Sequence, residues 1–305
     1  MVADIVGRPL RAMPDAGRLV LVDEMHLYTG GCAVNTATAL ARLGLPVKLI
    51  GKVGNDSLGD FLVNELVQRG INIESVKRDG EVGTSTTMVL VDADGERRFI
   101  HYIGANATLS LEDIDERAFE NASILHIAGT LVMPSVDGEP TAELLRSAQA
   151  AGMTTFLDTV WDDTGRWMLL MEPCLPHIDY FIPSLPEARA ITRLDVPEEI
   201  AAALLECGVG TVGLKMGADG CLVMTSEGDS IRAPAYDVNV VDATGAGDAF
   251  AAGFIAGVWL GWPLKQTAYL ANAVGALCVT GEGATGGVRS LEETNAFMEE
   301  TSLKV

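Results

Sequence analysis

Basic residues are scarce in this sequence. Lys and Arg number 21 against 42 Asp and Glu, so the formal net charge is −21 over 305 residues. Wrapping a nucleic acid or lying on an anionic membrane requires a positive field, and we therefore expect neither partner. The acidity leaves phosphate ligands open, because backbone N–H groups and a metal ion can hold them.

Clustered cysteines, paired histidines and long apolar runs are also lacking. The five cysteines are scattered without a C-x-x-C pair, which predicts reduced thiols and a cytoplasmic protein. The four histidines show no zinc-ligand spacing. The start has no apolar signal core, and the longest apolar stretch, residues 249–262, suits a buried helix rather than a membrane span.

Strand-like and helix-like segments alternate along most of the chain, without a linker or an internal repeat. Segments rich in apolar or β-branched residues predict strands at 47–53, 124–127, 154–157, 180–182 and 211–214. Helical spacing predicts helices at 35–43, 58–69, 142–151, 187–191 and 268–279. This alternation is typical of a mostly parallel sheet with helices on both faces.

Two segments break the alternation. Residues 18–28 are strand-like without a following crossover, and residues 84–102 predict a hairpin that turns around Asp92 to Gly95. Such strands favour a small separate sheet, acting as a lid over a site or as a dimer surface. Antiparallel edge strands on the main sheet are the alternative, and periodicity does not choose between them.

The most informative segment, residues 240–250, reads VVDATGAGDAF. An apolar strand at Val240 and Val241 is expected to lead into a Gly-Ala-Gly turn and then a helix. Small residues let the N–H groups of 245–247 converge at the helix N-terminus, which favours an anion. Asp248 in the first turn can be a simple cap. A carboxylate beside a phosphate cradle, however, is what a kinase needs to accept a hydroxyl proton.

A second glycine-rich turn, Gly30-Gly31, enters the helix expected from Asn35. Its plain interpretation is a tight turn with Asn35 as a helix cap. In the functional interpretation the glycines let a ligand approach the backbone, and the Asn35 amide bonds a substrate hydroxyl.

These two segments resemble the diagnostic motifs of the ribokinase-like sugar kinases of the phosphofructokinase-B type. The matching stretches are Gly30 to Gly44 and Asp242 to Phe250, with lesser marks in the same order at 54–59, 104–106, 183–187, 215–220 and Asn272. The resemblance covers residues 1–305 as one kinase domain. It implies an α/β fold, a three-layer α/β/α sandwich with a mostly parallel central sheet and a small β-sheet lid at 18–28 and 84–102.

The resemblance also implies the chemistry: phosphorylation of a sugar hydroxyl by ATP with Mg²⁺. Asp248 would be the catalytic base, and Gly245, Ala246 and Gly247 would form the anion hole. Glu187 would help to bind Mg²⁺ through water. Asp242 and Thr244, with the loop 281–287, resemble a monovalent-cation site for K⁺.

Further residues are carried over as binding residues. Those matched to nucleotide contacts are Ser184, Lys215, Gly217, Gly220 and Asn272, and those matched to sugar contacts are Asp4, Gly30, Gly31, Asn35 and Asn106. In many relatives the lid also pairs two subunits, so a homodimer is expected.

The sequence departs from the family pattern at Ser184 and at its start. Ser184 stands where many members have Asn, three residues before the Glu, and is a shorter group for a phosphate or a metal-bound water. Members usually open with an apolar strand and then an Asp about 25 residues before the Gly-Gly, which Asp4 matches better than Asp15 in its turn. We therefore expect the natural start to lie upstream and the first strand of the central sheet to be shortened.

Two other classes of protein share features with this sequence. Residues 281–286 fit G-x-G-x-x-G, but they follow a helix-like stretch and leave no room for the βαβ unit of a dinucleotide-binding oxidoreductase. A sugar-binding regulator that has lost its chemistry is the other alternative. Asp248, Glu187 and the Gly-Ala-Gly turn argue against it.

The substrate is less sharply indicated. Relatives that act on phosphorylated sugars tend to carry Lys after the Gly-Gly, and this chain has Cys32. Together with the acidity, this favours a free, ribose- or fructose-like sugar, with an adenosine-like nucleoside second. Arg97 and Arg98 on the hairpin keep a keto-acid sugar such as 2-keto-3-deoxygluconate open.

Overall fold

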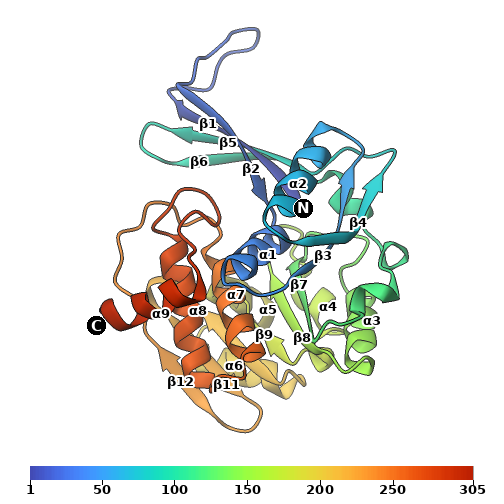
Figure 1. Cartoon of the computed structure of the whole chain (residues 1–305), viewed down its shortest axis with the longest axis vertical. Helices are drawn as coiled ribbons and strands as arrows, with labels where there is room; N and C mark the ends of the chain where they lie inside the picture. The colour runs from blue at the N-terminus through green and yellow to red at the C-terminus, as the bar shows by residue number, and fades with distance from the viewer. Residues whose placement is uncertain (305) are drawn as a thin grey trace.

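The computed structural model of the chain describes residues 1–304 (Figure 1). Its strands, in chain order, are β1 (Val2–Leu10), β2 (Glu24–Gly30), β3 (Lys48–Gly54), β4 (Asn72–Asp79), β5 (Thr86–Asp92), β6 (Arg97–Tyr102), β7 (Ile124–Thr130), β8 (Thr154–Thr159), β9 (Tyr180–Phe181), β10 (Thr211–Lys215), β11 (Cys221–Thr225) and β12 (Ser230–Ala233). Its α-helices are α1 (Cys32–Arg42), α2 (Ser57–Gln68), α3 (Glu139–Ala150), α4 (Trp167–Met171), α5 (Leu185–Thr192), α6 (Pro197–Glu206), α7 (Ala246–Trp259), α8 (Leu264–Cys278) and α9 (Leu291–Glu300).

The main sheet has six strands in the order β12-β11-β10-β9-β8-β7. Strands β7 to β10 are parallel to one another, and β11 and β12 turn back antiparallel at one edge. The predicted strands at 124–127, 154–157, 180–182 and 211–214 are confirmed, within a few residues, as β7 to β10. Because parallel strands end at the same edge, polar residues that follow them meet there.

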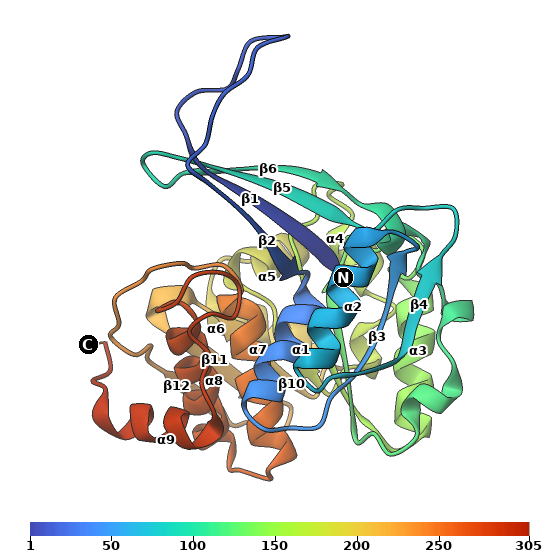
Figure 2. The ribbon, with the colours of Figure 1, turned by 45° about the horizontal axis from the view of Figure 1, so that its top comes forward.

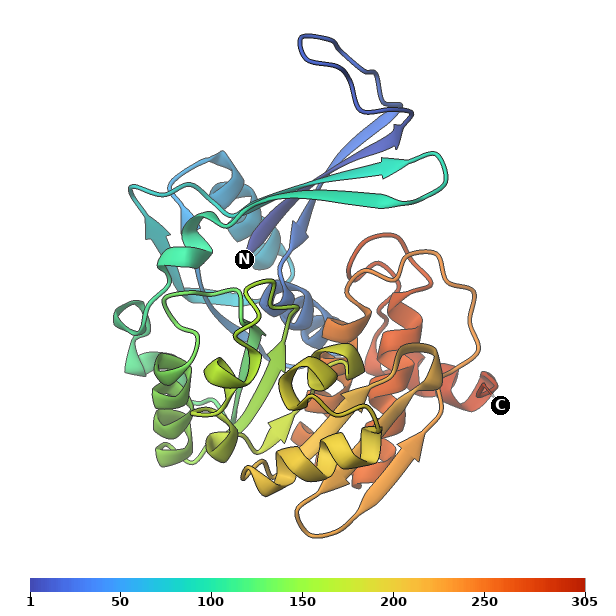
Figure 3. The ribbon, with the colours of Figure 1, turned by 180° about the vertical axis from the view of Figure 1, so that it is seen from behind.

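Helices cover both faces of this sheet, as the alternating pattern predicts. One core contains Leu157 with α3, α5 and α6, and the other contains Phe156 with α1, α7 and α8. Neighbouring residues of β8 thus point into opposite cores. Figure 1 shows α1, α7 and α8 in front of the sheet, and Figure 3 shows α3 to α6 from behind. The apolar stretch that begins at Ala249 is the buried helix α7.

A separate four-stranded sheet, β2-β1-β5-β6, projects from the body (Figure 2). We call it the lid sheet. The predicted hairpin at 84–102 is confirmed as β5 and β6, with the expected turn after Asp92. The strand expected at 18–28 is partly wrong, because β2 begins only at Glu24 and residues 18–23 are in no strand.

The first strand of the chain also differs from expectation. β1 pairs antiparallel with β2 and parallel with β5, so all of it belongs to the lid sheet and none to the main sheet. The expected shortened central strand is therefore wrong for the described residues. Strands β3 and β4 form a third, two-stranded parallel sheet, packed under α1 and α2.

The structure also describes the state of the cysteines and the length of the apolar helices. All five cysteines are free thiols. Within residues 1–304, every helix is too short or too polar to span a bilayer.

Candidate active site

The turn that opens α7 is shaped for an anion. Gly245 has a φ of 74°, and a Cβ there would overlap the carbonyl of Ala284, so only glycine fits. The N–H groups of Gly245, Gly247 and Asp248 find no acceptor among the described residues. These free donors lie at the N-terminus of a 14-residue helix, where the helix dipole also favours negative charge. One expectation fails here, because Val240 and Val241 are exposed and in no strand.

Asp248 lies half-buried in the first turn of α7 and is held by the second glycine-rich segment. The Asn35 amide donates to its Oδ2 at 2.8 Å, and the Thr36 hydroxyl donates to its backbone carbonyl at 3.3 Å. Burial raises the pKa of Asp248, and the bond from Asn35 and the charge of Lys215 oppose the rise. The site thus places a carboxylate of increased basicity beside free amide donors, as a general base requires.

A buried ion pair next to the turn was not predicted from the sequence. Lys215, at the end of β10, places its Nζ 2.7 and 2.6 Å from the two carboxylate oxygens of Asp158 in β8. Burial opposes the charge of Lys215, but the carboxylates of Asp158, Glu187 and Asp248 outweigh it and raise its pKa. Gly247 is adjacent, because a Cβ there would lie 3.3 Å from the Lys215 Nζ. Lys215 therefore places an ammonium group, paired with Asp158, beside the anion turn.

Asp158 could have been found from its position. It follows the predicted strand 154–157, and a polar residue at the carboxyl end of a parallel strand lies at the edge where ligands bind. Cys32 is a second residue without a predicted role that the fold brings to Asp248. Burial raises the pKa of its thiol well above the usual range, so the thiol stays protonated beside the carboxylate.

Ser184 and Glu187 are joined at the start of α5. Ser184 caps the helix, its N–H donates to Glu187 Oε2 at 2.9 Å, and the Glu187 N–H donates to its Oγ at 3.4 Å. The Thr159 hydroxyl donates to the same Glu187 oxygen at 3.1 Å. The serine in place of the usual Asn thus completes a capping box, which orients Glu187 at the strand ends.

The residues present are compatible with Mg²⁺ bound to a nucleotide. Within residues 1–304 no group of three His, Cys, Asp or Glu side chains forms a protein-only metal site. Mg²⁺ in phosphate sites usually has one or two carboxylates, several waters and phosphate oxygens as ligands. Asp158, Glu187 and Asp248 all act on the pKa of Lys215, so carboxylates lie close to the anion turn.

The residues expected to bind sugar meet where the lid sheet joins α1. The Asp4 carboxylate, in β1, lies directly against Gly30, where any Cβ would overlap it. Gly31 has a φ of 91° and opens α1, which carries Asn35. Burial raises the pKa of Asp4 to about 6. Asn106 accepts a 2.9 Å hydrogen bond from the Met1 amino group through its Oδ1.

Of the other residues expected to bind nucleotide, Asn272 and Gly220 contact the turn after β12, whereas Gly217 does not. Asn272 donates from its amide to the carbonyls of Ala233 and Pro234 at 3.0 and 3.1 Å. Gly220, with a φ of 80°, is required because a Cβ would overlap the carbonyl of Ala233. Both residues therefore shape the turn after β12. Gly217, by contrast, has open space around its Cα.

The expected monovalent-cation residues are in contact with an arginine of the lid sheet. Arg97 in β6 donates from Nη2 to Asp242 Oδ1 at 2.7 Å and from Nη1 to the Thr244 hydroxyl. The N–H of Gly283, in the loop 281–287, donates to Asp242 Oδ2 at 3.0 Å. Burial opposes ionisation of Asp242, but these bonds and the N–H of Thr244 lower its pKa. Arg98 pairs with Asp92 at 3.3 Å.

Comparison with known proteins agrees with this geometry. The profile of the pfkB family carbohydrate kinases matches residues 1–291. The chain belongs to this family. It is thus a sugar kinase, a phosphotransferase with an alcohol group as acceptor.

Curated relatives of this pfkB-family kinase differ in substrate. It is 33% identical over 301 residues to an ATP-dependent ribose-1-phosphate kinase of Halopiger xanaduensis, covering 94% of this chain and 92% of the relative. It is 29% identical over 293 residues to the 2-dehydro-3-deoxygluconokinase of Bacillus subtilis, covering 92% and 90%. The family is therefore shown, while the relatives do not agree on one sugar.

Solved structures place this pfkB-family kinase in the ribokinase-like fold. A structure from Escherichia coli, provisionally assigned as a ribokinase II and solved with ATP and Mg²⁺, superposes with a TM-score of 0.85 at 26% identity, covering 97% of this chain and 96% of that chain. The predicted fold class is confirmed. ATP and Mg²⁺ are thus ligands of a structural neighbour.

Proposed function

We propose that this kinase transfers the γ-phosphoryl group of ATP to a hydroxyl of a free sugar, with Asp248 as catalytic base. The observation that carries the proposal is the 2.8 Å bond from Asn35 to the Asp248 carboxylate. This bond joins the helix behind Asp4 and Gly30 to the anion turn of α7. A sugar bound at Asp4 and Gly30 would therefore have the Asp248 base and the amide donors of the turn next to it.

Each residue has a role set by its chemistry. Asp248 accepts the proton of the attacking hydroxyl, while the N–H groups of Gly245 and Gly247 bind the charge of the transferring group. Lys215 places its ammonium group, which is paired with Asp158, beside that turn. Glu187 would hold Mg²⁺ through water, and the metal would offset the charge on the phosphates. Closure of the lid sheet would exclude water from the transfer.

A free sugar is our first choice of substrate because the arginines of the lid sheet that could bind a substrate phosphate are already paired. Lid residues Arg8, Arg97 and Arg98 are each paired with carboxylates. Cys32, where a Lys would bind a phosphate, is uncharged. The ribose-1-phosphate kinase relative makes a phosphorylated pentose the competing candidate. Two further candidate substrates are a nucleoside and 2-keto-3-deoxygluconate. The Bacillus subtilis relative favours the second of these.

Two further parts of the proposal concern K⁺ and assembly. Asp242, Thr244 and the loop 281–287 are the proposed monovalent-cation site. The Arg97 guanidinium binds the same Asp242 and Thr244 oxygens and would therefore compete with K⁺. The lid sheet is the proposed dimer surface, supported by exposed apolar side chains at Met88, Phe99 and Ile100. Sedimentation of the wild type and of Phe99→Ser tests it, and a monomeric wild type would contradict it.

The decisive experiment measures ADP release with Mg-ATP over ribose, fructose, 2-keto-3-deoxygluconate, adenosine and ribose 1-phosphate. We expect a signal with a free sugar that falls by about 10²- to 10⁴-fold in Asp248→Asn. A signal only with ribose 1-phosphate would keep the reaction class and overturn the free-sugar choice. Sugar binding without turnover in either protein would instead favour the non-catalytic regulator.

A further inference from the structure

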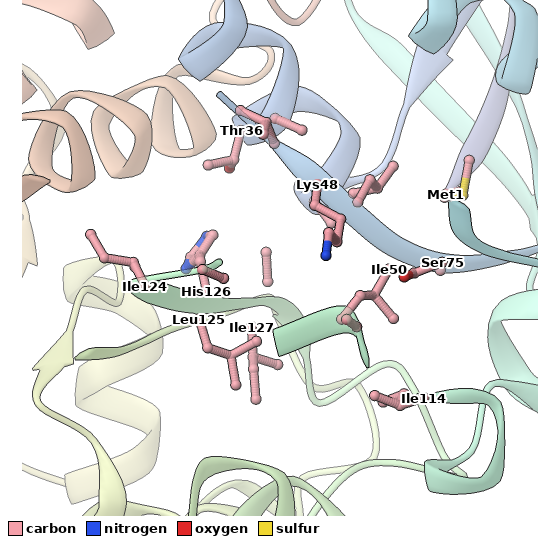
Figure 4. Close-up of a pocket in the computed structure, with 18 of the residues that line it drawn as sticks. Met1, Thr36, Lys48, Ile50, Ser75, Ile114, Ile124, Leu125, His126 and Ile127 are labelled. Atoms are coloured by element: carbon pink, nitrogen blue, oxygen red, sulfur yellow. The ribbon is translucent and has the colours of Figure 1, made fainter. Parts of the chain in front are cut away.

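Helix α1 presents two faces of different character. Thr36, Ala37 and Leu40 line a cavity of about 1020 Å³ that lies between β3 and β7, and Figure 4 shows Thr36 on α1 beside this space. Residues four apart share one side of a helix, whereas residues two apart lie on nearly opposite sides. Thr38 and Arg42 therefore lie together on the side of α1 that faces away from the cavity.

Arg42 has two arginine neighbours on this side of α1. Arg69, which ends α2, donates from its Nη1 to the Thr38 hydroxyl at 3.2 Å. Arg42 donates from its Nη1 to the carbonyl of Thr285, and Arg289 follows Thr285 by four residues. Burial lowers the pKa of Arg42, and the nearby charges of Arg69 and Arg289 lower it further. We call Arg42, Arg69 and Arg289 the arginine cluster.

The arginine cluster carries more positive charge than its surroundings neutralise. Arg69 pairs with Glu65 of its own helix at 2.8 Å, but in residues 1–304 neither Arg42 nor Arg289 forms an ion pair. The nearby carboxylate of Glu293 is already held in the capping box of α9. The chain has twice as many acidic as basic residues. A local excess of positive charge is therefore contrary to its overall composition.

The chemistry of the arginine cluster selects an oxyanion. A guanidinium group is a planar fork of N–H donors that matches the oxygens of a phosphate or a carboxylate. Arg42 and Arg289 repel each other, and an anion between them would remove this repulsion. A dianion would neutralise both charges at once. Both side chains are exposed, so a ligand can reach them from solvent.

The arginine cluster lies behind the anion turn. Thr285, which accepts the hydrogen bond from Arg42, belongs to the loop 281–287. The preceding carbonyl of Ala284 lies against Gly245 of the turn, where a Cβ would overlap it. Arg42 is on α1, and Arg289 comes directly after the loop. An anion that bridges these two arginines would thus hold the loop against α1.

We propose that Arg42 and Arg289 form a second anion site, distinct from the anion turn of α7, which binds a phosphate dianion, either free or as a phosphate monoester, and fastens the loop 281–287 to α1. Arg69 adds its charge and is itself fixed by Glu65 and Thr38. The inference concerns this second site and does not depend on the proposed sugar chemistry.

The test removes the two exposed arginines from the whole chain. Arg42→Gln combined with Arg289→Gln deletes the site. Arg146→Gln combined with Arg232→Gln is the matched control, because it removes the same charge from two surface ion pairs. Arg289→Gln alone is a milder variant, since the Arg289 side chain forms no hydrogen bond within residues 1–304.

The probes are inorganic phosphate and glycerol 2-phosphate, without nucleotide or sugar and at constant ionic strength set with chloride. Each is used at about 20 mM, because stabilisation by a ligand grows with its concentration. Mass spectrometry measures hydrogen exchange in residues 38–43, 245–248 and 285–289. The thermal midpoint is measured in the same solutions.

In the wild type and the control, at least one probe should slow exchange in residues 285–289 by about threefold or more and raise Tm by roughly 2 °C. Both effects should be lost in the variant that lacks Arg42 and Arg289, and most of each in Arg289→Gln. A stronger effect of glycerol 2-phosphate than of phosphate would support the site and identify a monoester as its ligand.

Two results would overturn the second site. The first is equal protection of residues 285–289 in the wild type and in the variant without Arg42 and Arg289, because that protection would come from phosphate at the anion turn, residues 245–248. The second is a wild type in which neither probe protects residues 285–289. None of these readouts requires catalytic activity.

Discussion

The guanidinium of Arg97 lies 2.7 Å from the carboxylate of Asp242, three residues before the anion turn. Asp242 also accepts hydrogen bonds from the N–H groups of Thr244 and Gly283, at 2.8 and 3.0 Å. One carboxylate thus connects the lid sheet, the start of α7 and the loop 281–287. Movement of the lid sheet is thereby linked to the geometry of the proposed phosphate site.

Replacing Arg97 with Gln should make the kinase depend on a monovalent cation. In the wild type the guanidinium supplies the positive charge at Asp242, so exchanging K⁺ for tetramethylammonium should change kcat/KM by less than about twofold. In Arg97→Gln, kcat/KM should fall about tenfold without K⁺, or about 1.4 kcal/mol of barrier, and recover with K⁺.

The matched control for this prediction is Arg98→Gln. Arg98 follows Arg97 in β6 but pairs with Asp92 instead of Asp242. It should behave as the wild type in both salts. A wild type that already requires K⁺ as strongly as Arg97→Gln would contradict the role given to Arg97.

Replacing Asn35 with Ala should move the acid limb of the pH profile to higher pH. Burial raises the pKa of Asp248, and the Asn35 hydrogen bond counteracts the rise by favouring the charged form. A base is active when deprotonated, so loss of that bond moves the fall in kcat/KM toward neutral pH. The profile of kcat/KM against pH measures this shift.

Thr36→Val is the control for Asn35→Ala. Thr36 bonds the backbone carbonyl of Asp248 and not its carboxylate. The acid limb of the pH profile of Thr36→Val should therefore lie at the same pH as in the wild type. Equal shifts in both variants would mean that helix α1, rather than the Asn35 amide, sets the pKa.

Removing one partner of the Asp158–Lys215 pair should destabilise the fold strongly. Their side chains are 4% and 12% exposed, and Lys215→Met leaves a buried carboxylate without its cation. The expected loss is about 3–5 kcal/mol in the free energy of unfolding. Urea unfolding of Lys215→Met, Asp158→Asn and the double variant measures it.

The double variant should lose less than the sum of the two single variants, because it leaves no unpaired charge. Arg146→Met provides the comparison, since Arg146 pairs with Glu139 at the surface and its loss should cost less than about 1 kcal/mol. Strictly additive losses at Asp158 and Lys215 would show that the two charges do not stabilise each other.

Replacing Asp4 with Asn should stabilise the protein above pH 6 while weakening sugar binding. The folded-state pKa of Asp4 is raised from 3.8 to about 6. The folded chain therefore binds the proton more tightly than the unfolded chain, and the contribution of Asp4 to stability falls as pH rises from 4 to 6.

Unfolding of Asp4→Asn by urea at several pH values measures this change. The stability of the variant should not show the fall between pH 4 and pH 6 that Asp4 causes in the wild type. Above pH 6, its free energy of unfolding should exceed that of the wild type by up to about 3 kcal/mol. Its KM for the sugar should rise. An unchanged pH dependence of stability would mean that Asp4 is solvated in the folded state.

Local sequence was sufficient to predict elements and motifs whose cause is local. The glycines of the 245–247 turn act within a few residues, and the turn opens a helix as predicted. The capping box of Ser184 with Glu187 is equally local, although it was not predicted. Periodicity predicted the strands β7 to β10 and the helices around them for the same reason. That Asn35 would donate to Asp248 was not predicted, although both were proposed as site residues.

Sheet membership could not be read from the sequence, because strand pairing joins distant residues. Residues 2–10 pair with 24–30 and with 86–92 in the lid sheet rather than entering the main sheet. Val240 and Val241 are apolar and β-branched, yet find no strand to pair with. The ion pair of Asp158 with Lys215 links residues 57 positions apart, and no local pattern predicts such a contact.

The sequence by itself thus determined the α/β architecture, the family and the anion turn, since these follow from short motifs and from the alternation of apolar runs. Only the tertiary structure decided that Arg97 reaches Asp242, that Lys215 is paired beside the turn and that β3 and β7 face each other across a cavity. Those relationships depend on how distant segments pack, because side-chain charge and strand edges act through space.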